Sequence, residues 1–256
     1  MTKGRDDEIL RLFGETPETA RLDDLHRGGL RLLQDPSCFC FGCDAVLLSA
    51  FARARAGESA LDLCSGSGVV PVLMTAKTEA GRFAAVEILP RQAELLRKNI
   101  ALNGLSEKMT ATEGDVKYLS EYVEKSSFDV VTANPPYIRA GSGVKNPDEN
   151  RAAARHETRL TLPELLAGAA YALRERGRLY MIHRPGRLPE VMAELAARGL
   201  SPRKLRMVQP KLHKKPAMFL IEAVKGGGDG LTVLPALIIH NGDGSYTDEV
   251  YDIYYN

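Results

Sequence analysis

The sequence lacks several features that would assign it to a special class of protein. No apolar run approaches the roughly 20 residues needed to span a bilayer, and no early segment combines a basic start with a long apolar stretch. These absences argue against a membrane protein or a secreted one. The formal net charge of +1 by itself predicts no polyanionic partner. At 256 residues the chain can bury a full core, and we expect a cytoplasmic protein.

Cysteine is scarce, and its spacing is not typical of a metal site. Three cysteines lie in the cluster CFCFGC, as Cys38, Cys40 and Cys43, and the fourth is Cys64. The paired CxxC or CxxC-plus-HxxxH arrangement of zinc domains is missing, although Cys64 or His26 would offer a fourth ligand. We therefore predict reduced, structural thiols and no metal.

The charge is unevenly spread along the chain. Residues 1–133 carry 16 Lys and Arg against 20 Asp and Glu, residues 134–225 carry 18 against 8, and residues 226–256 carry none against 5. The middle segment therefore has a net charge of +10. Its residues 201–220 hold six basic residues and no acid. Such asymmetry indicates a nucleic-acid-binding face, with a solvated surface run as the alternative.

From residue 60 onward, short apolar runs alternate with helix-length amphipathic stretches, which favours a parallel sheet covered on both faces. A capping box of Thr161 and Glu164 is expected to start one helix, and Gly177 to end it. We predict an α/β fold with a Rossmann-like, doubly wound, mostly parallel seven-stranded sheet. Its strands are expected over 60–64, 82–88, 109–115, 127–133, 178–183, 203–208 and 217–224, and its helices over 69–80, 91–102, 162–176 and 189–198.

Shorter segments are expected on either side of this domain. The entry segment should form a hairpin that turns at Asp35-Pro36, followed by a helix capped by Asp44, which would lie near the turn after the first strand. The glycine-rich stretch GGGDG is a flexible break that leads into an appendage. The predicted organisation is an N-terminal extension (1–56), a main domain (57–225) and a C-terminal tail (226–256).

Polar residues follow the predicted strands at the edge where a doubly wound sheet binds its ligands. The turn SGSG (65–68) lets the backbone approach a ligand, and Glu87, 19 residues after Gly68, can accept hydrogen bonds from ribose hydroxyls. Proline stands at position 71, where a dinucleotide fingerprint has its third glycine, which argues against a nicotinamide dinucleotide. Together with Asp115 and Asn134, these residues predict a nucleoside-binding pocket.

The motif ANPPY (133–137) directly follows an apolar strand and supplies the predicted catalytic residues Asn134, Pro135, Pro136 and Tyr137. Adjacent prolines have fixed φ and no backbone donor, so they hold Asn134 and Tyr137 rigidly at the strand end. An exocyclic amine on a ring has a delocalised lone pair. The Asn134 side-chain oxygen and the Pro135 carbonyl can restore its electron density by accepting its hydrogens. Tyr137 is expected to stack on the target base.

The order of these motifs resembles that of class I S-adenosylmethionine-dependent methyltransferases, in the branch whose [DNS]PP[YFW] motif serves to methylate planar nitrogens. The resemblance rests on LDLCSGSGVV, VEI, EGD and FDVVTANPPY. It implies that Asp62, Gly66 and Gly68 hold the methionine end of the cofactor S-adenosylmethionine, Glu87 its ribose and Asp115 its adenine amine. Their motif neighbours complete the cofactor site that the resemblance implies: Cys64, Ile88 and Val116.

Over most of its length the chain also resembles the adenine-N6 methyltransferases that act on valine transfer RNA beside the anticodon. The resemblance rests on LRLLQDPSCFCFGCDAVLLSAF, NPPY, the RHE loop, HRPGRL, HKKPAMFLIEAVKGGGDGL and DGSYTDEV, whereas the first 20 residues add nothing. It implies that Phe41 and Asp44 close over the cofactor. The RNA-binding residues that we expect are Arg151 and Arg155, in a loop over a flipped base, Lys211 at phosphates, and His213, Lys214 and Lys215.

The predicted function is methyl transfer to the N6 amine of an adenine in tRNA. One alternative is methylation of a glutamine in a translation release factor, because that family also uses NPPY. Another is a cofactor-binding interaction protein without catalysis. The basic residues favour RNA over a peptide, and an intact Asn134 and Tyr137 favour an enzyme. The modified nucleotide and the oligomeric state stay open.

Overall fold

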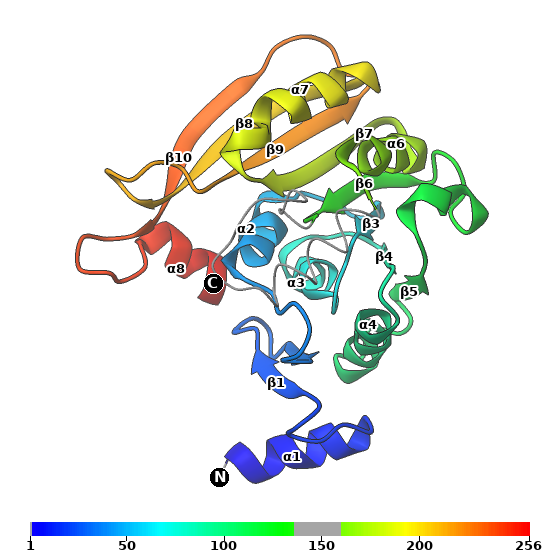
Figure 1. Ribbon diagram of the computed structural model, residues 1–256, viewed down its shortest axis with the longest axis vertical. Coiled ribbons are helices and arrows are strands. Elements are labelled where there is room, and N and C mark those ends of the chain that lie inside the picture. Colours follow the sequence, from blue (N-terminus) through cyan, green and yellow to red (C-terminus); the bar gives the residue numbers. More distant parts are fainter. Residues whose placement is uncertain (1, 136–159) are drawn as a thin grey trace.

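The structure is a computed structural model, and it describes residues 2–135 and 160–256. Its centre is an eight-stranded sheet with helices on both sides, as Figure 1 shows. In order across the sheet, the strands are β10 (Thr232–His240), β8 (Leu200–Lys211), β9 (Met218–Lys225), β7 (Leu173–His183), β6 (Phe128–Ala133), β3 (Ser59–Leu63), β4 (Arg82–Glu87) and β5 (Met109–Glu113).

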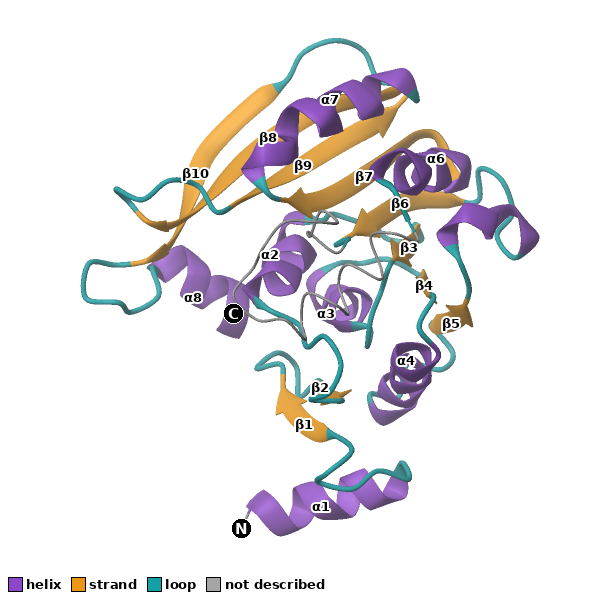
Figure 2. Cartoon of the chain, in the orientation of Figure 1, coloured by secondary structure: helices purple, strands orange, loops and turns teal. Residues whose placement is uncertain are grey.

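A separate two-stranded sheet and the helices surround this sheet (Figure 2). The small sheet pairs β1 (Arg21–Asp24) with β2 (Arg31–Gln34). The α-helices are α1 (Thr2–Leu12), α2 (Cys43–Phe51), α3 (Val69–Lys77), α4 (Pro90–Leu102), α6 (Leu162–Ala172), α7 (Leu188–Ala197) and α8 (Asp248–Tyr255), and the short 3₁₀ helices are η1 (Val116–Glu121) and η2 (Pro185–Arg187).

Every strand of the large sheet except β9 runs in the same direction. β5, β4, β3, β6 and β7 pair in parallel, β9 is antiparallel to both β7 and β8, and β10 is parallel to β8. The predicted α/β class and mostly parallel sheet are confirmed. Because of this topology, the carboxyl ends of seven strands meet at one edge, together with the turn that joins β8 to β9. We call it the carboxyl edge.

Alternate residues of the central strands face two different hydrophobic clusters, because successive side chains of a strand point to opposite faces. Ala60, Val130 and Tyr180 pack in the cluster formed with α2, α3, α4 and α8. Their neighbours Leu61 and Val131 pack in the cluster formed with η1, α6 and α7. Both faces of the sheet are therefore covered, which explains why its strands are apolar almost throughout.

Helix α6 starts as predicted but ends earlier. Thr161 and Glu164 form the capping box, in which the Thr161 N donates to Glu164 Oε2 at 2.7 Å. The predicted end at Gly177 is wrong, because Leu173 pairs with Phe128 and already belongs to β7. A Cβ at Gly177 would lie 2.9 Å from the Arg174 carbonyl oxygen, so glycine serves close packing inside the strand instead.

Two expectations for the entry segment are also wrong. The hairpin turns between β1 and β2, where the Leu25 N donates to the Leu30 O at 3.0 Å, and not at Asp35-Pro36. The N-cap of α2 is Gly42, without a side-chain cap, and not Asp44. Asp44 lies in the first turn of α2, is buried, and has a different partner.

The segment after residue 226 contributes more to the sheet than an appendage would. Strand β10 pairs with β8 and is the strand by which the sheet exceeds the predicted seven. Its register shifts between Leu234 and Leu237, around Pro235, and proline is tolerated because β10 is an edge strand. The proline and the preceding glycines obscure the strand in the sequence. Val250 of α8 is fully buried and joins the α2 and α3 cluster.

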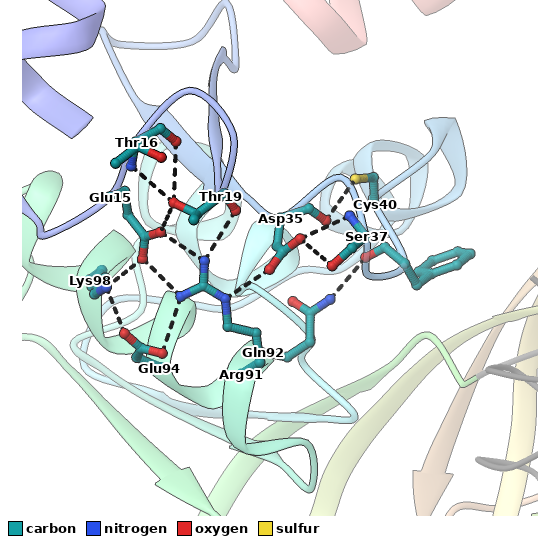
Figure 3. Close-up of polar contacts among 11 residues, drawn as sticks. Glu15, Thr16, Thr19, Asp35, Ser37, Cys40, Arg91, Gln92, Glu94 and Lys98 are labelled. Atoms are coloured by element: carbon teal, nitrogen blue, oxygen red, sulfur yellow. Dashed lines mark hydrogen bonds and ion pairs between the residues drawn. The ribbon is translucent and has the colours of Figure 1, made fainter. Parts of the chain in front are cut away.

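A cluster of charged residues around Arg91, drawn in Figure 3, attaches the first 20 residues to the main body. The Arg91 guanidinium donates to both carboxylate oxygens of Glu15 at 2.8 Å, to Asp35 Oδ2 at 2.9 Å and to Glu94 Oε2 at 3.1 Å. Lys98 also donates to Glu15. The bond from Arg91 is the main reason why the pKa of buried Glu15 falls to about 2. The cluster thus joins the segment before β1, the loop after β2 and α4.

The Glu15 carboxylate makes the stability of this attachment depend on pH. Its folded pKa of about 2 lies below the ordinary 4.5, so the contribution is complete above pH 4.5 and is lost as the pH falls to 2. The shift corresponds to about 3 kcal/mol. We expect Glu15→Gln to lower the free energy of unfolding by about that amount at pH 7, and the difference from wild type to shrink in acid.

Urea unfolding of both proteins at pH 7, 4.5 and 3 measures this difference. The matched control is Glu113→Gln, which removes an exposed pair with Arg97 at 3.3 Å and should cost less than about 1 kcal/mol. Equal losses in the two variants at pH 7, or a Glu15→Gln difference that does not vary with pH, would contradict the role given to the cluster.

Candidate active site

The turn after β3 leaves the sheet through backbone conformations that favour glycine. Cys64, Gly66 and Gly68 have φ of 57°, 56° and 93°, and the Ser65 N donates to the Val86 O at 3.0 Å. A Cβ at Gly68 would lie 2.4 Å from Leu96 Cδ1, whereas a Cβ at Gly66 would meet nothing within 4 Å. Gly68 therefore permits the close approach of α4, and Gly66 leaves open space at the carboxyl edge.

Asp62, near the end of β3, is buried and joins β3 to the neighbouring strand. It accepts hydrogen bonds from Ser65 Oγ at 2.6 Å and from Thr132 Oγ1 at 2.5 Å. Burial raises the pKa of Asp62 to about 7, although both hydrogen bonds oppose the shift. The carboxyl group therefore changes its charge near neutral pH. Sequence reasoning had missed Ser65 and Thr132, the two hydroxyl donors.

Glu87, the last residue of β4, connects its own strand end to the glycine turn. Its Oε2 accepts from the Gly66 N and its Oε1 from the Leu89 N, each at 2.8 Å. Burial raises the pKa of Glu87 despite these bonds. A carboxylate has about four lone-pair sites, so both oxygens keep capacity to accept further hydrogen bonds. The structure thus brings Asp62, Gly66 and Glu87 together, as the sequence predicts.

Asn134, directly after β6, is oriented by a residue far away in the sequence. Its Nδ2 donates to Asp44 Oδ2 at 3.1 Å, and the Asp44 side chain comes from the first turn of α2. A primary amide that donates to one side directs its oxygen to the other side, so Asn134 Oδ1 points away from this carboxylate. Asp44, predicted to close over the cofactor, thus contacts the predicted catalytic residue. Pro135 is buried beside it.

Four of the predicted site residues lie outside the described residues: Pro136, Tyr137, Arg151 and Arg155. The predicted RNA-binding residues that are described lie in or next to the turn between β8 and β9. Lys211 is partly buried and its Nζ donates to the Gly242 O at 3.2 Å, and the side chains of His213, Lys214 and Lys215 are exposed. Because β9 is reversed, this turn lies at the carboxyl edge, where His183 pairs with Phe219.

Of the five remaining predicted cofactor residues, Asp115, Val116 and Phe41 have partners within the fold. Asp115 caps η1, where its Oδ1 accepts from the Lys117 N at 3.0 Å. Val116 is buried against Gly168 of α6, because a Cβ added at Gly168 would lie only 2.7 Å from the Val116 Cγ1. The Phe41 N donates to Gln34 Oε1 at 2.9 Å. Ile88, directly after β4, is partly exposed. Burial raises the pKa of the Cys64 thiol.

Two amides of α4 are site neighbours that sequence reasoning missed. Asn99 donates to the Leu33 O at 3.0 Å and to the Ser67 O at 2.8 Å, so it joins β2 to the glycine turn. Gln92 donates to the Phe39 O at 3.0 Å, and its buried Oε1 has no hydrogen-bond partner among residues 2–135 and 160–256. The signal was available in the sequence, because residues seven apart share one helical face and this one is otherwise apolar.

His183 is a further residue that the structure brings to the carboxyl edge. It is buried at the end of β7, its ring stacks on Phe219 at 6.3 Å, and its Nδ1 accepts from the Arg184 N at 2.7 Å. Burial lowers the pKa of His183 to about 4, so the imidazole is neutral at pH 7. Together with Pro135 and Thr161 it lines a small cavity. Pro135 and the preceding Asn134 form the bend after β6 that we call the Asn134 corner.

The four cysteines are unpaired thiols, and within residues 2–135 and 160–256 no group of three His, Cys, Asp or Glu side chains could hold a metal ion. Over the same residues, no helix is both long and apolar enough to cross a bilayer. Burial raises the pKa of Cys38, Cys40 and Cys43, which keeps these thiols protonated at pH 7.

This arrangement of a glycine turn, two buried acids and an Asn-Pro corner lies within residues 41–196, which match the family model described as "methyltransferase small domain". The chain belongs to this family. The match covers more than half of the chain and includes the strands and helices from α2 to α7.

Curated relatives agree with this family assignment, and solved structures agree with the fold. A Porphyromonas gingivalis protein named "tRNA1(Val) (adenine(37)-N6)-methyltransferase" is 31% identical over 81% of this chain and 84% of its own. A Haemophilus influenzae protein of the same name is 28% identical over 84% and 89%. A predicted O-methyltransferase from Agrobacterium tumefaciens has a TM-score of 0.67 at 21% identity, covering 82% of this chain and 95% of its own. That structure supports the fold alone.

The two glycines of the turn allow a matched test of its packing. We expect Gly68→Ala to lower the free energy of unfolding by roughly 2 kcal/mol or more, because it combines a left-handed φ with a contact to buried Leu96. Gly66→Ala has the left-handed φ but faces open space, and should cost only about 1 kcal/mol. Urea unfolding at pH 7 measures both values. Equal losses would show that the approach of α4 does not depend on Gly68.

Proposed function

We propose that this protein transfers the methyl group of S-adenosylmethionine to the N6 amine of adenine 37 in valine tRNA. The observation that carries the proposal is the bond from Asn134 Nδ2 to Asp44, which orients an amide oxygen at the carboxyl edge of a methyltransferase fold. The relatives from Porphyromonas gingivalis and Haemophilus influenzae bear this activity in their names and align over most of the chain.

The acceptor-rich carboxyl edge fits the proposed cofactor. S-adenosylmethionine presents a cationic amine, a positive sulfonium and a ribose diol, and when bound it supplies a methyl group on a leaving group that is already activated. Glu87 keeps acceptor capacity for the diol, and Asp62 is an anion above its pKa of about 7. Gly66 faces open space that a ligand can occupy, and Gln92 Oε1 is a buried acceptor without a partner in the part of the chain that the structure describes.

The Asn134 corner can orient the N6 amine of the target adenine and raise the electron density on its nitrogen. Asn134 Oδ1 and the Pro135 carbonyl accept the two amine hydrogens, which aligns the nitrogen and returns electron density to it. The hydrogen bond to Asp44 polarises the Asn134 amide, so its oxygen becomes a stronger acceptor. The nitrogen forms its bond to the methyl carbon while the carbon–sulfur bond breaks, the donor leaves as the neutral thioether S-adenosylhomocysteine, and the nitrogen then gives one proton to water. Asp44 is therefore proposed as a positioning residue.

The basic turn between β8 and β9 supports RNA as the substrate. Its exposed side chains His213, Lys214 and Lys215 lie at the same edge of the sheet as Asn134. Lysines at such a position can contact phosphates without reading a base, so they position the RNA and do not specify it. We infer that the turn contacts the backbone of the tRNA.

The test of the proposed function is methyl transfer by wild type and Asn134→Ala. We expect wild type with labelled donor to modify a valine tRNA transcript, and to leave unlabelled a transcript in which guanosine replaces the target adenosine. Asn134→Ala should lower kcat at least about 100-fold, because one transition-state acceptor is lost, with the Kd for S-adenosylmethionine unchanged. Label that resists ribonuclease and appears in a release-factor glutamine would overturn the RNA assignment. A variant with near wild-type turnover would overturn the role of Asn134.

Salt dependence tests the basic turn. Each phosphate contact contributes a slope of roughly 0.7–0.9 to the dependence of log Kd on log salt concentration. We expect Lys214→Ala/Lys215→Ala to reduce the slope for tRNA by between one and two. The control with the same change of charge is Lys108→Ala/Lys125→Ala. These lysines precede β5 and β6 at the opposite edge of the sheet, so their removal should leave the salt slope unchanged. The same slope in both double variants would show that the turn does not contact RNA.

A further inference from the structure

Six aromatic rings form a continuous row near the C-terminus, and we call it the aromatic row. His240 stacks on Tyr246 at 5.2 Å and Tyr246 on Tyr254 at 5.2 Å, with interplanar angles of 15° and 13°. Tyr255 continues the row and contacts Tyr254 at 6.1 Å. The other two ring contacts of Tyr255 are to Tyr251 at 4.6 Å and to His26 at 5.2 Å. The row thus joins the end of β10, helix α8 and the turn of the β1–β2 hairpin.

The middle of the row is packed into the body, and the rings of Tyr251 and Tyr255 beyond it are exposed. Tyr254 packs against the core cluster of α2 and α3. Tyr251 and Tyr255, four residues apart on one face of α8, are 53% and 40% exposed. Adjacent exposed rings keep apolar surface in contact with water, which often marks a binding surface.

Helix α8 has attachments besides these exposed rings. Val250 is fully buried, Lys77 Nζ donates to the Ile253 O at 3.0 Å, and Arg206 pairs with Glu249 at 2.7 Å. The Lys77 ammonium lies near the C-terminal end of α8, where a cation is favourable. Val250, Ile253 and Glu249 therefore anchor the helix, and the exposed surfaces of Tyr251 and Tyr255 can contact a partner.

The aromatic row lies between the Asn134 corner and the basic turn. Tyr254 packs in the same core cluster as Cys43, which directly precedes Asp44, and burial together with the nearby charge of Asp44 raises the pKa of its hydroxyl. His240, at one end of the row, pairs in register with Lys211, which starts the basic turn. Figure 2 shows α8 lying beside α2.

We infer that the aromatic row is a stacking surface for unpaired bases of the RNA that this protein methylates, an inference that rests on the proposed function. Aromatic rings stack on any base, so such a surface grips a single-stranded loop without reading its sequence. The Arg27 guanidinium, which donates to the Asp252 O at 3.4 Å, adds a cation at this end of α8. Of the acids of α8, Glu249 is paired with Arg206 in the first turn, away from Tyr255.

The test compares removal of the rings with removal of the hydroxyls. Tyr251→Ala/Tyr255→Ala is expected to raise the KM for the tRNA transcript about tenfold or more, with kcat at saturating tRNA and the Kd for S-adenosylmethionine unchanged. Tyr251→Phe/Tyr255→Phe keeps both rings and should stay within about twofold of wild type. The control is Tyr118→Ala, which truncates a 56% exposed tyrosine on η1, beyond the other end of the sheet, and should leave KM unchanged.

A second arm identifies the contact as stacking. Abasic nucleotides next to the target adenosine should weaken binding of an anticodon stem-loop to wild type, and should add no further loss in the double alanine variant, because both changes remove the same contact. Fluorescence anisotropy measures this binding without turnover, so it gives a result even if adenine 37 is not the methylated base. If the double alanine variant is unstable, Tyr251→Ala alone serves in both arms.

Two results would overturn the inference. One is an unchanged KM and stem-loop affinity in the alanine variant while Asn134→Ala still abolishes turnover, which would leave the proposed function intact. The other is an equal loss in the phenylalanine and alanine variants, which would assign the contact to the hydroxyls. Stacking is supported if the alanine variant but not the phenylalanine variant loses affinity for the stem-loop, and if the two variants and wild type bind the abasic stem-loop equally.

Discussion

The hydrogen bond from Asn134 to Asp44 is the contact on which the functional interpretation depends. It joins the end of a central strand to the first turn of a helix 90 residues earlier, and it determines which way the amide faces. The rest of the fold supports this geometry. β6 is buried between β3 and β7, and α2 packs on the sheet with its apolar face, so neither partner can move far without disturbing the core.

Buried acids give the carboxyl edge its second property. Asp62 and Glu87 are nearly inaccessible to water, and among the described residues each is held by hydroxyl or backbone donors and not by a cation. Such carboxylates keep part of their capacity to accept hydrogen bonds, and their raised pKa values show that a positive ligand would be favourable there. This agrees with the proposal that the edge binds a cationic nucleoside.

Segments outside the family match extend this edge. The Arg91 cluster holds the loop after β2 beside α4, whose Gln92 contacts the same loop through the Phe39 carbonyl. At the other end of the chain, β10 widens the sheet and α8 packs on α2. The proposed cofactor side and the proposed RNA side of the site thus depend on parts of the chain that lie far apart in sequence.

The sequence alone determined the features that depend on neighbouring residues. Alternating apolar runs predicted the parallel core, and the Thr161 capping box started α6. The ordered motifs also predicted that Asp62, Glu87 and Asn134 lie at strand ends, where the structure has them. Predictions that depended on how strands pair failed. The end of α6 was decided by the pairing of Leu173 with Phe128, the hairpin turn by the pairing of β1 with β2, and β10 by the exposed edge of β8.

The same division applies within the site. Residue types at strand ends indicate which chemistry a site can perform. Their contacts form only when the chain folds, as the bond from Asn134 to Asp44 and the two hydroxyl bonds to Asp62 show. The same is true of the buried Gln92 oxygen, which has no partner among the described residues. The physical reason is that hydrogen-bond partners and burial are set by which surfaces come into contact. A local sequence pattern records the propensity of a segment, whereas its contacts depend on every other segment of the chain.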